Sequence, residues 1–129
     1  MSGKRRRGRW ITRGDRLTDW VFSRVVQSLS YEVEGIYLKR FLKDKFRGRE
    51  RDLCGFLDDG AIYLSKSKVV HRSRDEIART LLHEAFHFVF DRVLERDILS
   101  LEDIVWERLS AKQRAILKFF VPRRVTRSD

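Results

Sequence analysis

Residues 74–94 contain the longest apolar stretch of the sequence, and their pattern predicts a helix. Ser73, followed by Glu76 three positions later, has the pattern of a capping box, which marks a helix start. Apolar side chains occur on almost every side of this helix, namely Ile77, Ala78, Leu81, Leu82, Ala85, Phe86, Phe88, Val89 and Phe90. Since a helix that is apolar all round must be covered by other elements, we expect it at the centre of a domain.

The segment before it predicts one helix and one strand. Apolar residues at spacings of three and four predict a helix over 17–29, with Asp15 or Thr18 as its cap. Alternating residues then predict a strand over 31–38. The strongly charged residues 39–51 fit either a helical turn or a long connection.

A hairpin is predicted next. Two apolar runs, 53–57 and 61–65, flank Asp58-Asp59-Gly60, and Asp-Gly tolerates the positive φ angles of a tight turn. We therefore expect the two runs to be paired antiparallel strands.

A last helix is predicted over 101–119, where apolar residues form one continuous stripe. Ser100 and Asp103 repeat the cap pattern, and Pro122 follows the helix end. The fold class expected is α+β: an N-terminal helix, a short antiparallel sheet, a central helix and a C-terminal helix.

The chain has 129 residues and a net charge of +10, which predicts one domain with an unevenly charged surface. Seven basic residues lie within 1–16 against one acidic residue, so we expect a flexible basic arm over 1–14, a folded domain over 15–121 and a basic tail over 122–129. Such an arm can make weak, salt-sensitive contact with nucleic acid through residues 4–16.

The apolar stretches and the cysteine content of the sequence bear on where the protein is located in the cell. No stretch approaches the ~20 apolar residues of a membrane span, and no export signal is visible, so we expect no membrane association. Cys54 is the only cysteine and cannot form an internal disulfide, which favours a reducing, cytoplasmic location.

The central helix contains His83-Glu84-Ala85-Phe86-His87, an H-E-x-x-H motif. Residues four apart project from the same helix face, so two neutral imidazoles can reach one zinc ion. Glu84 lies beside the ion and can take a proton from a water that the zinc has made acidic. Burying these polar groups on an apolar helix would cost several kcal/mol without a compensating ion.

Two imidazoles need a third protein ligand, and the acidic candidates after the motif are Asp91, Glu95, Asp97, Glu102, Asp103 and Glu107. On a helical wheel, Glu102 lies beside the apolar stripe of the last predicted helix, whereas Asp103 and Glu107 point largely away from it. Glu102 is therefore preferred, with Asp103 and Glu107 as alternatives.

The chain resembles the zincin metallopeptidases, in particular the gluzincin type and its small phage- and bacteria-associated versions, and distantly the ImmA/IrrE group. The resemblance covers about residues 55–110 and is carried by the strand 61–65, the helix segment 80–87 and Glu107-Arg108-Leu109-Ser110. Asp91 stands where the ImmA/IrrE group usually has a further histidine.

The resemblance implies a zinc metallopeptidase that holds one zinc ion and cleaves a peptide or protein substrate. His83 and His87 would be ligands, Glu84 the general base, and a glutamate on a later helix the third ligand. In such families an extended peptide lies along the sheet edge before the motif helix, which here implies substrate contacts with Ile62, Tyr63 and Leu64. The alternative function is a non-catalytic module of zincin fold that docks on nucleic acid or an acidic partner through the basic arm.

Overall fold

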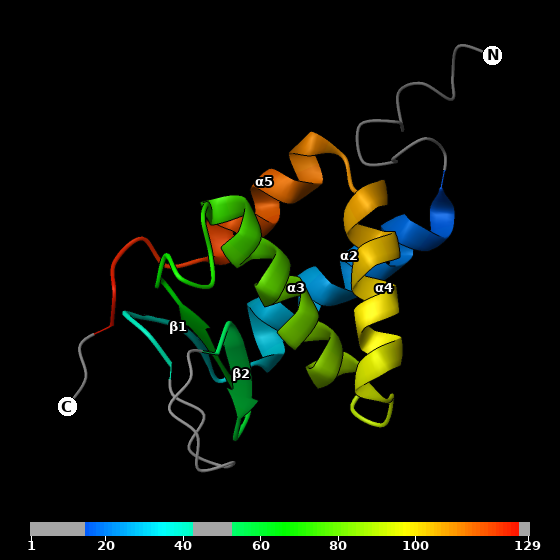
Figure 1. Cartoon of the computed structure of the whole chain (residues 1–129). Coiled ribbons are helices and arrows are strands. Elements are labelled where there is room, and N and C mark those ends of the chain that lie inside the picture. Colours follow the sequence, from blue (N-terminus) through cyan, green and yellow to red (C-terminus); the bar gives the residue numbers. More distant parts are fainter. Residues whose placement is uncertain (1–14, 43–52, 127–129) are drawn as a thin grey trace.

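Helix α3 (Arg74–Val89) runs through the centre of the structure, as its apolar surface predicts (Figure 1). The computed structural model describes residues 15–42 and 53–126. In chain order these residues form α2 (Arg16–Gln27), a π-helical turn η1 (Ser28–Glu32), β1 (Gly35–Lys39), β2 (Gly55–Asp58), β3 (Ala61–Ser65), α3, α4 (Glu95–Arg108) and α5 (Ala111–Phe120). Helix α3 packs against the sheet and against α2, α4 and α5. The described residues thus form an α+β domain with four α-helices and a three-stranded mixed sheet.

The start of α3 is capped nearly as predicted. The Ser73 side chain accepts a hydrogen bond from the backbone N–H of Glu76. The Glu76 carboxylate accepts from the N–H of Arg72 instead of Ser73, so the second half of the capping box is displaced by one residue. Along the helix, Ala78, Leu81, Leu82, Ala85 and Phe86 are completely buried, and they form the centre of the core.

The predicted hairpin is confirmed. Strands β2 and β3 pair antiparallel, with Phe56 opposite Tyr63. The turn between them has positive φ at Asp59 (51°) and Gly60 (82°), the backbone conformation that the Asp-Gly pair permits.

The expectation of a wholly antiparallel sheet is wrong, because β1 pairs parallel to β3. The strand order is β1-β3-β2, so β3 is the central strand. The hairpin makes β3 antiparallel to β2. Strand β3 lies between β1 and β2 and runs in the same direction as β1. The predicted position of residues 61–65 at a sheet edge is also wrong, since both sides of β3 are already paired.

The strand predicted over 31–38 begins later than expected, and the central helix ends earlier. Asp15 caps α2 by accepting from the N–H of Thr18, as predicted. Residues up to Glu32 continue in the π-helical turn, however, so the strand predicted over 31–38 begins only at Gly35. Helix α3 ends at Val89 rather than at residue 94.

The single helix predicted over 101–119 is two helices. Leu109 and Ser110 adopt extended backbone conformations between α4 and α5, and Ser110 forms a capping box with Gln113. Ser100 lies inside α4, where its hydroxyl donates to the carbonyl of Arg96, so it does not cap a helix. The apolar stripe continues through the break because both helices pack on α3.

Some predictions concern other parts of the chain. The basic arm over 1–14 and most of the charged segment 39–51 lie outside the described residues, as do the last three residues of the basic tail. Among the residues that the structure describes, no helix has the length and apolar character needed to cross a bilayer.

Candidate metal centre

The two histidines of the H-E-x-x-H motif face each other from successive turns of α3. Their Nε2 atoms lie 3.1 Å apart, and the imidazole planes are inclined by 67°. Two nitrogens that bind one zinc ion at ~2.0–2.1 Å with tetrahedral angles lie roughly 3.4 Å apart, so this spacing is close to that of a ligand pair. Both side chains are partly buried, with exposed fractions of 12% for His83 and 28% for His87.

Glu95, the first residue of α4, completes a group that can hold a metal ion. Its Oε1 lies 2.6 Å from Nε2 of His87, and its Oε2 lies 3.2 Å from Nε2 of His83. One ligand atom from each of the three residues falls within 4.8 Å of the others. Nitrogen and oxygen lone pairs that converge in this way fit a divalent cation such as zinc.

The chain reaches this position by a tight turn after α3. The N–H of Phe90 bonds back to the carbonyl of Phe86, and Leu94 serves as the N-cap of α4. Glu95 was one of six acidic candidates in the sequence but was not the preferred one. A sequence signal for it is the pair Glu95 and Asp97, because acidic residues are typical of the first turn of a helix.

Glu102, the residue preferred from the sequence, lies on the opposite side of the His83 ring. Its Oε1 is 2.8 Å from Nδ1 of His83, which therefore donates a hydrogen bond to the carboxylate. This bond leaves the Nε2 lone pair of His83 directed to the side where Glu95 lies. Glu95 and Glu102 are seven residues apart, about two helical turns, so one face of α4 presents both carboxylates to α3.

Arg79 holds the far side of Glu102 and was not singled out by the sequence. It lies one turn before His83 on α3 and forms ion pairs with Glu102 and Asp103. Asp103 is therefore occupied by Arg79, and Glu107 is exposed on α4. Neither takes part in the group of candidate ligands.

These contacts shift the pKa values of the ion-paired groups. Burial is the largest single effect and disfavours charge on His83 and Glu102, but hydrogen bonds and opposite charges together outweigh it. The pKa of His83 is raised by the Glu102 hydrogen bond and by nearby carboxylates, and that of Glu102 is lowered by His83 and Arg79. Burial likewise opposes charge on Arg79, and Glu102 and Asp103 reverse the effect and raise its pKa.

Glu84 is buried, with only 8% of its surface exposed. Burial raises its pKa to about 7, and the negative charges of Glu95 and Glu102 add to this effect, while His83 opposes it. Among the described residues, no hydrogen bond holds its carboxylate. A buried carboxylate that is close to the histidines and has no such partner can accept and release a proton.

The third histidine of the chain has a structural role. His71 is buried, its Nδ1 donates to the carbonyl of Ser65, and its Nε2 accepts from the hydroxyl of Thr80. Burial lowers the pKa of His71 despite these bonds, so the neutral ring joins the end of β3 to α3.

The chain was compared with protein families, curated proteins and solved structures, and the function is argued from the geometry above. No family model, curated protein or solved structure matches the chain.

The residues predicted to bind substrate are not accessible as a strand edge. Ile62 and Leu64 are completely buried on the core face of the sheet, and their strand is paired on both sides. Tyr63 lies on the other face, where its ring stacks between those of Tyr37 and Phe56. The residue pattern identified the strand, but the strand order depends on pairing with β1, which is distant in sequence.

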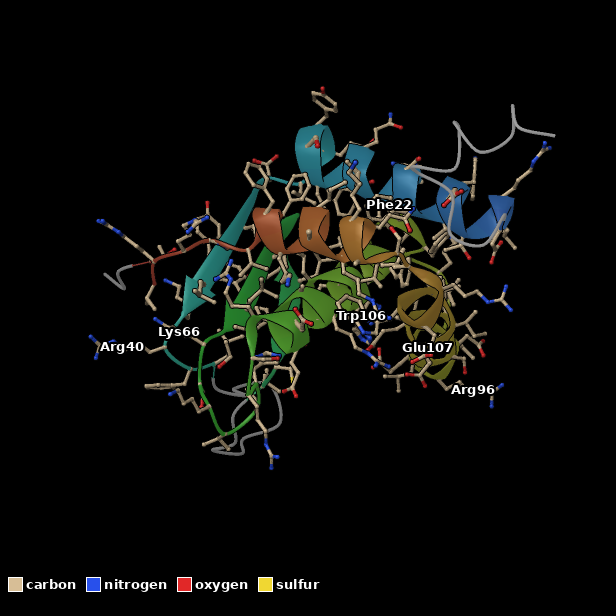
Figure 2. All side chains as sticks on the ribbon, turned by 90° about the horizontal axis from the view of Figure 1, so that it is seen from above. Phe22, Arg40, Lys66, Arg96, Trp106 and Glu107 are labelled. Carbon is tan, nitrogen blue, oxygen red and sulfur yellow. The ribbon has the colours of Figure 1, made fainter. Side chains whose placement is uncertain are left out.

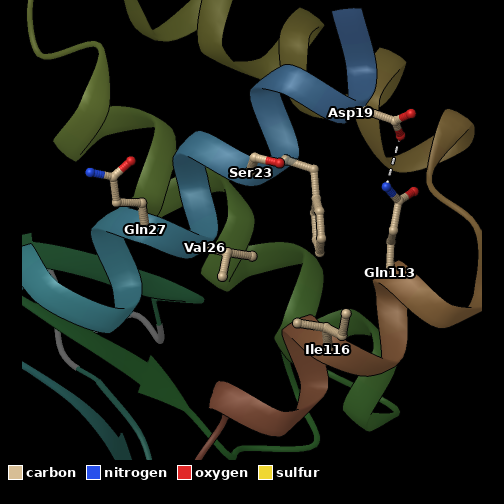
Figure 3. Close-up of a pocket in the computed structure, with 7 residues that line it drawn as sticks. Asp19, Ser23, Val26, Gln27, Gln113 and Ile116 are labelled. Carbon is tan, nitrogen blue, oxygen red and sulfur yellow. Dashed lines mark hydrogen bonds between the residues drawn. The ribbon is translucent and has the colours of Figure 1, made fainter. Parts of the chain in front are cut away.

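A separate pocket of about 470 Å³ lies between α2 and α5 (Figure 3). Its walls are mainly apolar, with Phe22, Val26 and Ile116 among the lining residues. Asp19 and Gln113 are hydrogen-bonded at one end, at 2.9 Å. No lining residue belongs to the group of His83, His87 and Glu95, so this pocket is distinct from the candidate metal centre.

Proposed function

We propose that this protein is a zinc-dependent metallopeptidase in which His83, His87 and Glu95 hold the ion. The observation that carries the proposal is the convergence of two Nε2 atoms and one carboxylate beside the buried carboxylate of Glu84. Two imidazoles and one carboxylate form a ligand set typical of catalytic zinc, which keeps a fourth position open for water or substrate. Glu95 replaces Glu102 as our preferred third ligand.

The chemistry follows from the roles of the side chains. Zinc, when bound, acts as a Lewis acid that lowers the pKa of water and polarises a substrate carbonyl. Glu84 accepts the proton of the attacking water and passes it to the amine that leaves. Glu102 receives the Nδ1 hydrogen of His83 and thereby keeps that ring in one tautomer and one orientation.

Strand β2 offers a position for an extended peptide. It pairs with β3 on one side, and no described strand pairs with its other side. At Gly55 it passes close to α3: a Cβ placed there would lie 2.9 Å from Cγ2 of Thr80, one turn before the motif. A peptide added to the outer side of β2 would form backbone hydrogen bonds with the strand that passes this part of α3.

The decisive experiment substitutes Glu84→Gln in zinc-loaded protein and follows cleavage of an unfolded protein substrate by mass spectrometry. We expect cleavage to fall by at least about 10²-fold, since a neutral amide cannot take the proton. Zinc content, measured by elemental analysis, should stay at the wild-type level.

Glu107→Gln is the matched control, because it removes a carboxylate from the exposed surface of α4. It should keep both zinc and cleavage. Undiminished cleavage by the Glu84→Gln variant would contradict the mechanism, and a wild-type protein that takes up no zinc would contradict the whole proposal.

A further inference from the structure

A basic pocket lies where β1 and β3 end, away from the candidate metal centre. It has a volume of about 490 Å³ and is lined by Arg40, Lys66, Arg123, Arg124 and Val125. The four basic residues come from three segments that are distant in sequence. Arg123 and Arg124 belong to the basic tail predicted from the sequence, but only the fold brings them together with Arg40 and Lys66.

Backbone hydrogen bonds hold the three segments in place. The N–H of Lys66 donates to the carbonyl of Lys39 at 2.7 Å, which extends the pairing of β3 with β1. The N–H of Thr126 donates to the carbonyl of Leu38 at 2.6 Å, so the segment after α5 lies along β1. Arg74 donates to the carbonyls of Lys118 and Val121 and fixes the end of α5. The pocket is therefore supported by ordered backbone.

The four cations have no neutralising partner in the described part of the chain. Each is exposed, and none forms an ion pair with a described carboxylate. Like charges that line one pocket repel each other, and an anion between them would remove this repulsion. Figure 2 shows Arg40 and Lys66 at the end of the molecule opposite Arg96 and Glu107 of α4.

The strands that end at the pocket also carry a row of aromatic rings. Tyr37 of β1, Tyr63 of β3 and Phe56 of β2 are in register across the sheet face that is turned away from α3. The ring centroids of Tyr37 and Tyr63 are 5.3 Å apart, and those of Phe56 and Tyr63 are 4.9 Å apart. All three side chains are half-buried, so the row keeps an accessible apolar surface.

We infer that this end of the sheet binds single-stranded nucleic acid, with phosphates in the basic pocket and bases against the aromatic row. An open pocket with four exposed cations can contact more than one phosphate, which fits a polyphosphate backbone. Aromatic rings beside a cationic groove are typical of surfaces that bind single strands without sequence preference. An acidic peptide would use the cations but would leave the aromatic row without a role. The inference is independent of the proposed peptidase activity.

The test measures binding of the full chain to a fluorescent oligothymidine strand by anisotropy, over a range of salt concentrations. Two pocket variants, Arg40→Ala/Lys66→Ala and Arg123→Ala/Arg124→Ala, should each weaken binding at least about tenfold at low salt. Each should also reduce the slope of log affinity against log salt by about 1.4, or about 0.7 for each lost phosphate contact. Circular dichroism checks that the variants are folded.

Arg92→Ala/Arg96→Ala is the matched control, because it removes two exposed positive charges near α4. Residues 1–14 are present in every variant. A difference in affinity between the pocket variants and the control variant therefore reports on the pocket. An equal loss in the control pair, or no loss in the pocket pairs, would overturn the inference.

A second comparison separates base contact from simple charge attraction. Tyr37→Leu should weaken binding of oligothymidine at least about fivefold and leave binding of an abasic strand of the same length unchanged. Polyglutamate that binds as tightly as oligothymidine, or inorganic pyrophosphate that binds where oligothymidine does not, would contradict a nucleic-acid site.

Discussion

The Oε1 atom of Glu102 lies 2.8 Å from Nδ1 of His83, on the side of the ring opposite to Glu95. One imidazole is thus held between two carboxylates of the same helix. The carboxylate at Nδ1 orients the ring, and the carboxylate at Nε2 lies where a shared ion would be bound. This relationship separates two roles that the sequence alone could not distinguish.

The first prediction compares the two carboxylates. Glu102→Gln should weaken zinc binding by about 10–100-fold, as expected for a group that orients a ligand. Glu95→Gln should weaken it further, because it removes a negatively charged ligand. Competition with a chromogenic chelator measures both affinities, and Glu107→Gln serves as the control. The reverse order of effects would identify Glu102 as the direct ligand.

A second prediction concerns pH and His71. Burial lowers its pKa below the ordinary value of 6.5, so the unfolded chain takes up this proton first as the pH falls. Stability rises with pH wherever the unfolded state binds more protons, and His71 therefore contributes a loss of stability as the pH falls from 6.5 through its lowered native pKa. His71→Gln should remove this contribution, so that as the pH falls through this window the unfolding free energy of the variant falls less, or rises more, than that of the wild type. Urea unfolding of the metal-free protein at several pH values measures it, and an unchanged slope would contradict the prediction.

The third prediction concerns Gln113, which is 1% exposed. Its side chain donates to Oδ1 of Asp19 and accepts from the N–H of Ser110. Gln113→Ala should lower the free energy of unfolding by about 1–3 kcal/mol, since it leaves the N–H of Ser110 and the part-buried Oδ1 of Asp19 without their partners, while Ser110 still caps the helix. Phe119→Ala, on the exposed side of the same helix, should change it by less than about 0.5 kcal/mol. Equal effects in urea unfolding would show that the Gln113 bonds contribute nothing.

The fourth prediction concerns the hairpin turn. Gly60 has φ of 82°, a left-handed conformation that costs a residue with a Cβ about 1–2 kcal/mol. Gly60→Ala should lower the free energy of unfolding by this amount. Asp59→Gly should not lower it by as much, because Asp59 already has a positive φ of 51° that glycine adopts readily. Thermal unfolding of the two variants measures the difference, and a neutral Gly60→Ala would contradict the role of the turn.

Patterns between near neighbours predicted much of the local structure. The cap at Asp15, the Asp59-Gly60 turn and the start of α3 at Ser73 each depend on residues within four positions of one another. The facing of His83 and His87 has the same origin, because residues four apart share a helix face. The Ser110–Gln113 cap was also readable locally but was hidden by the continuous apolar stripe across the α4–α5 break.

The sequence by itself therefore determined the helix that carries the motif and the helix face that its two histidines share. Only the tertiary structure decided that β1 pairs parallel to β3, that Glu95 and not Glu102 faces both Nε2 atoms, and that four basic residues meet in one pocket. The physical reason is that these relationships depend on how separate elements pack. Successive residues of α4 point about 100° apart around the helix axis, so a small rotation of α4 changes which of its side chains faces α3. No local sequence pattern sets that rotation.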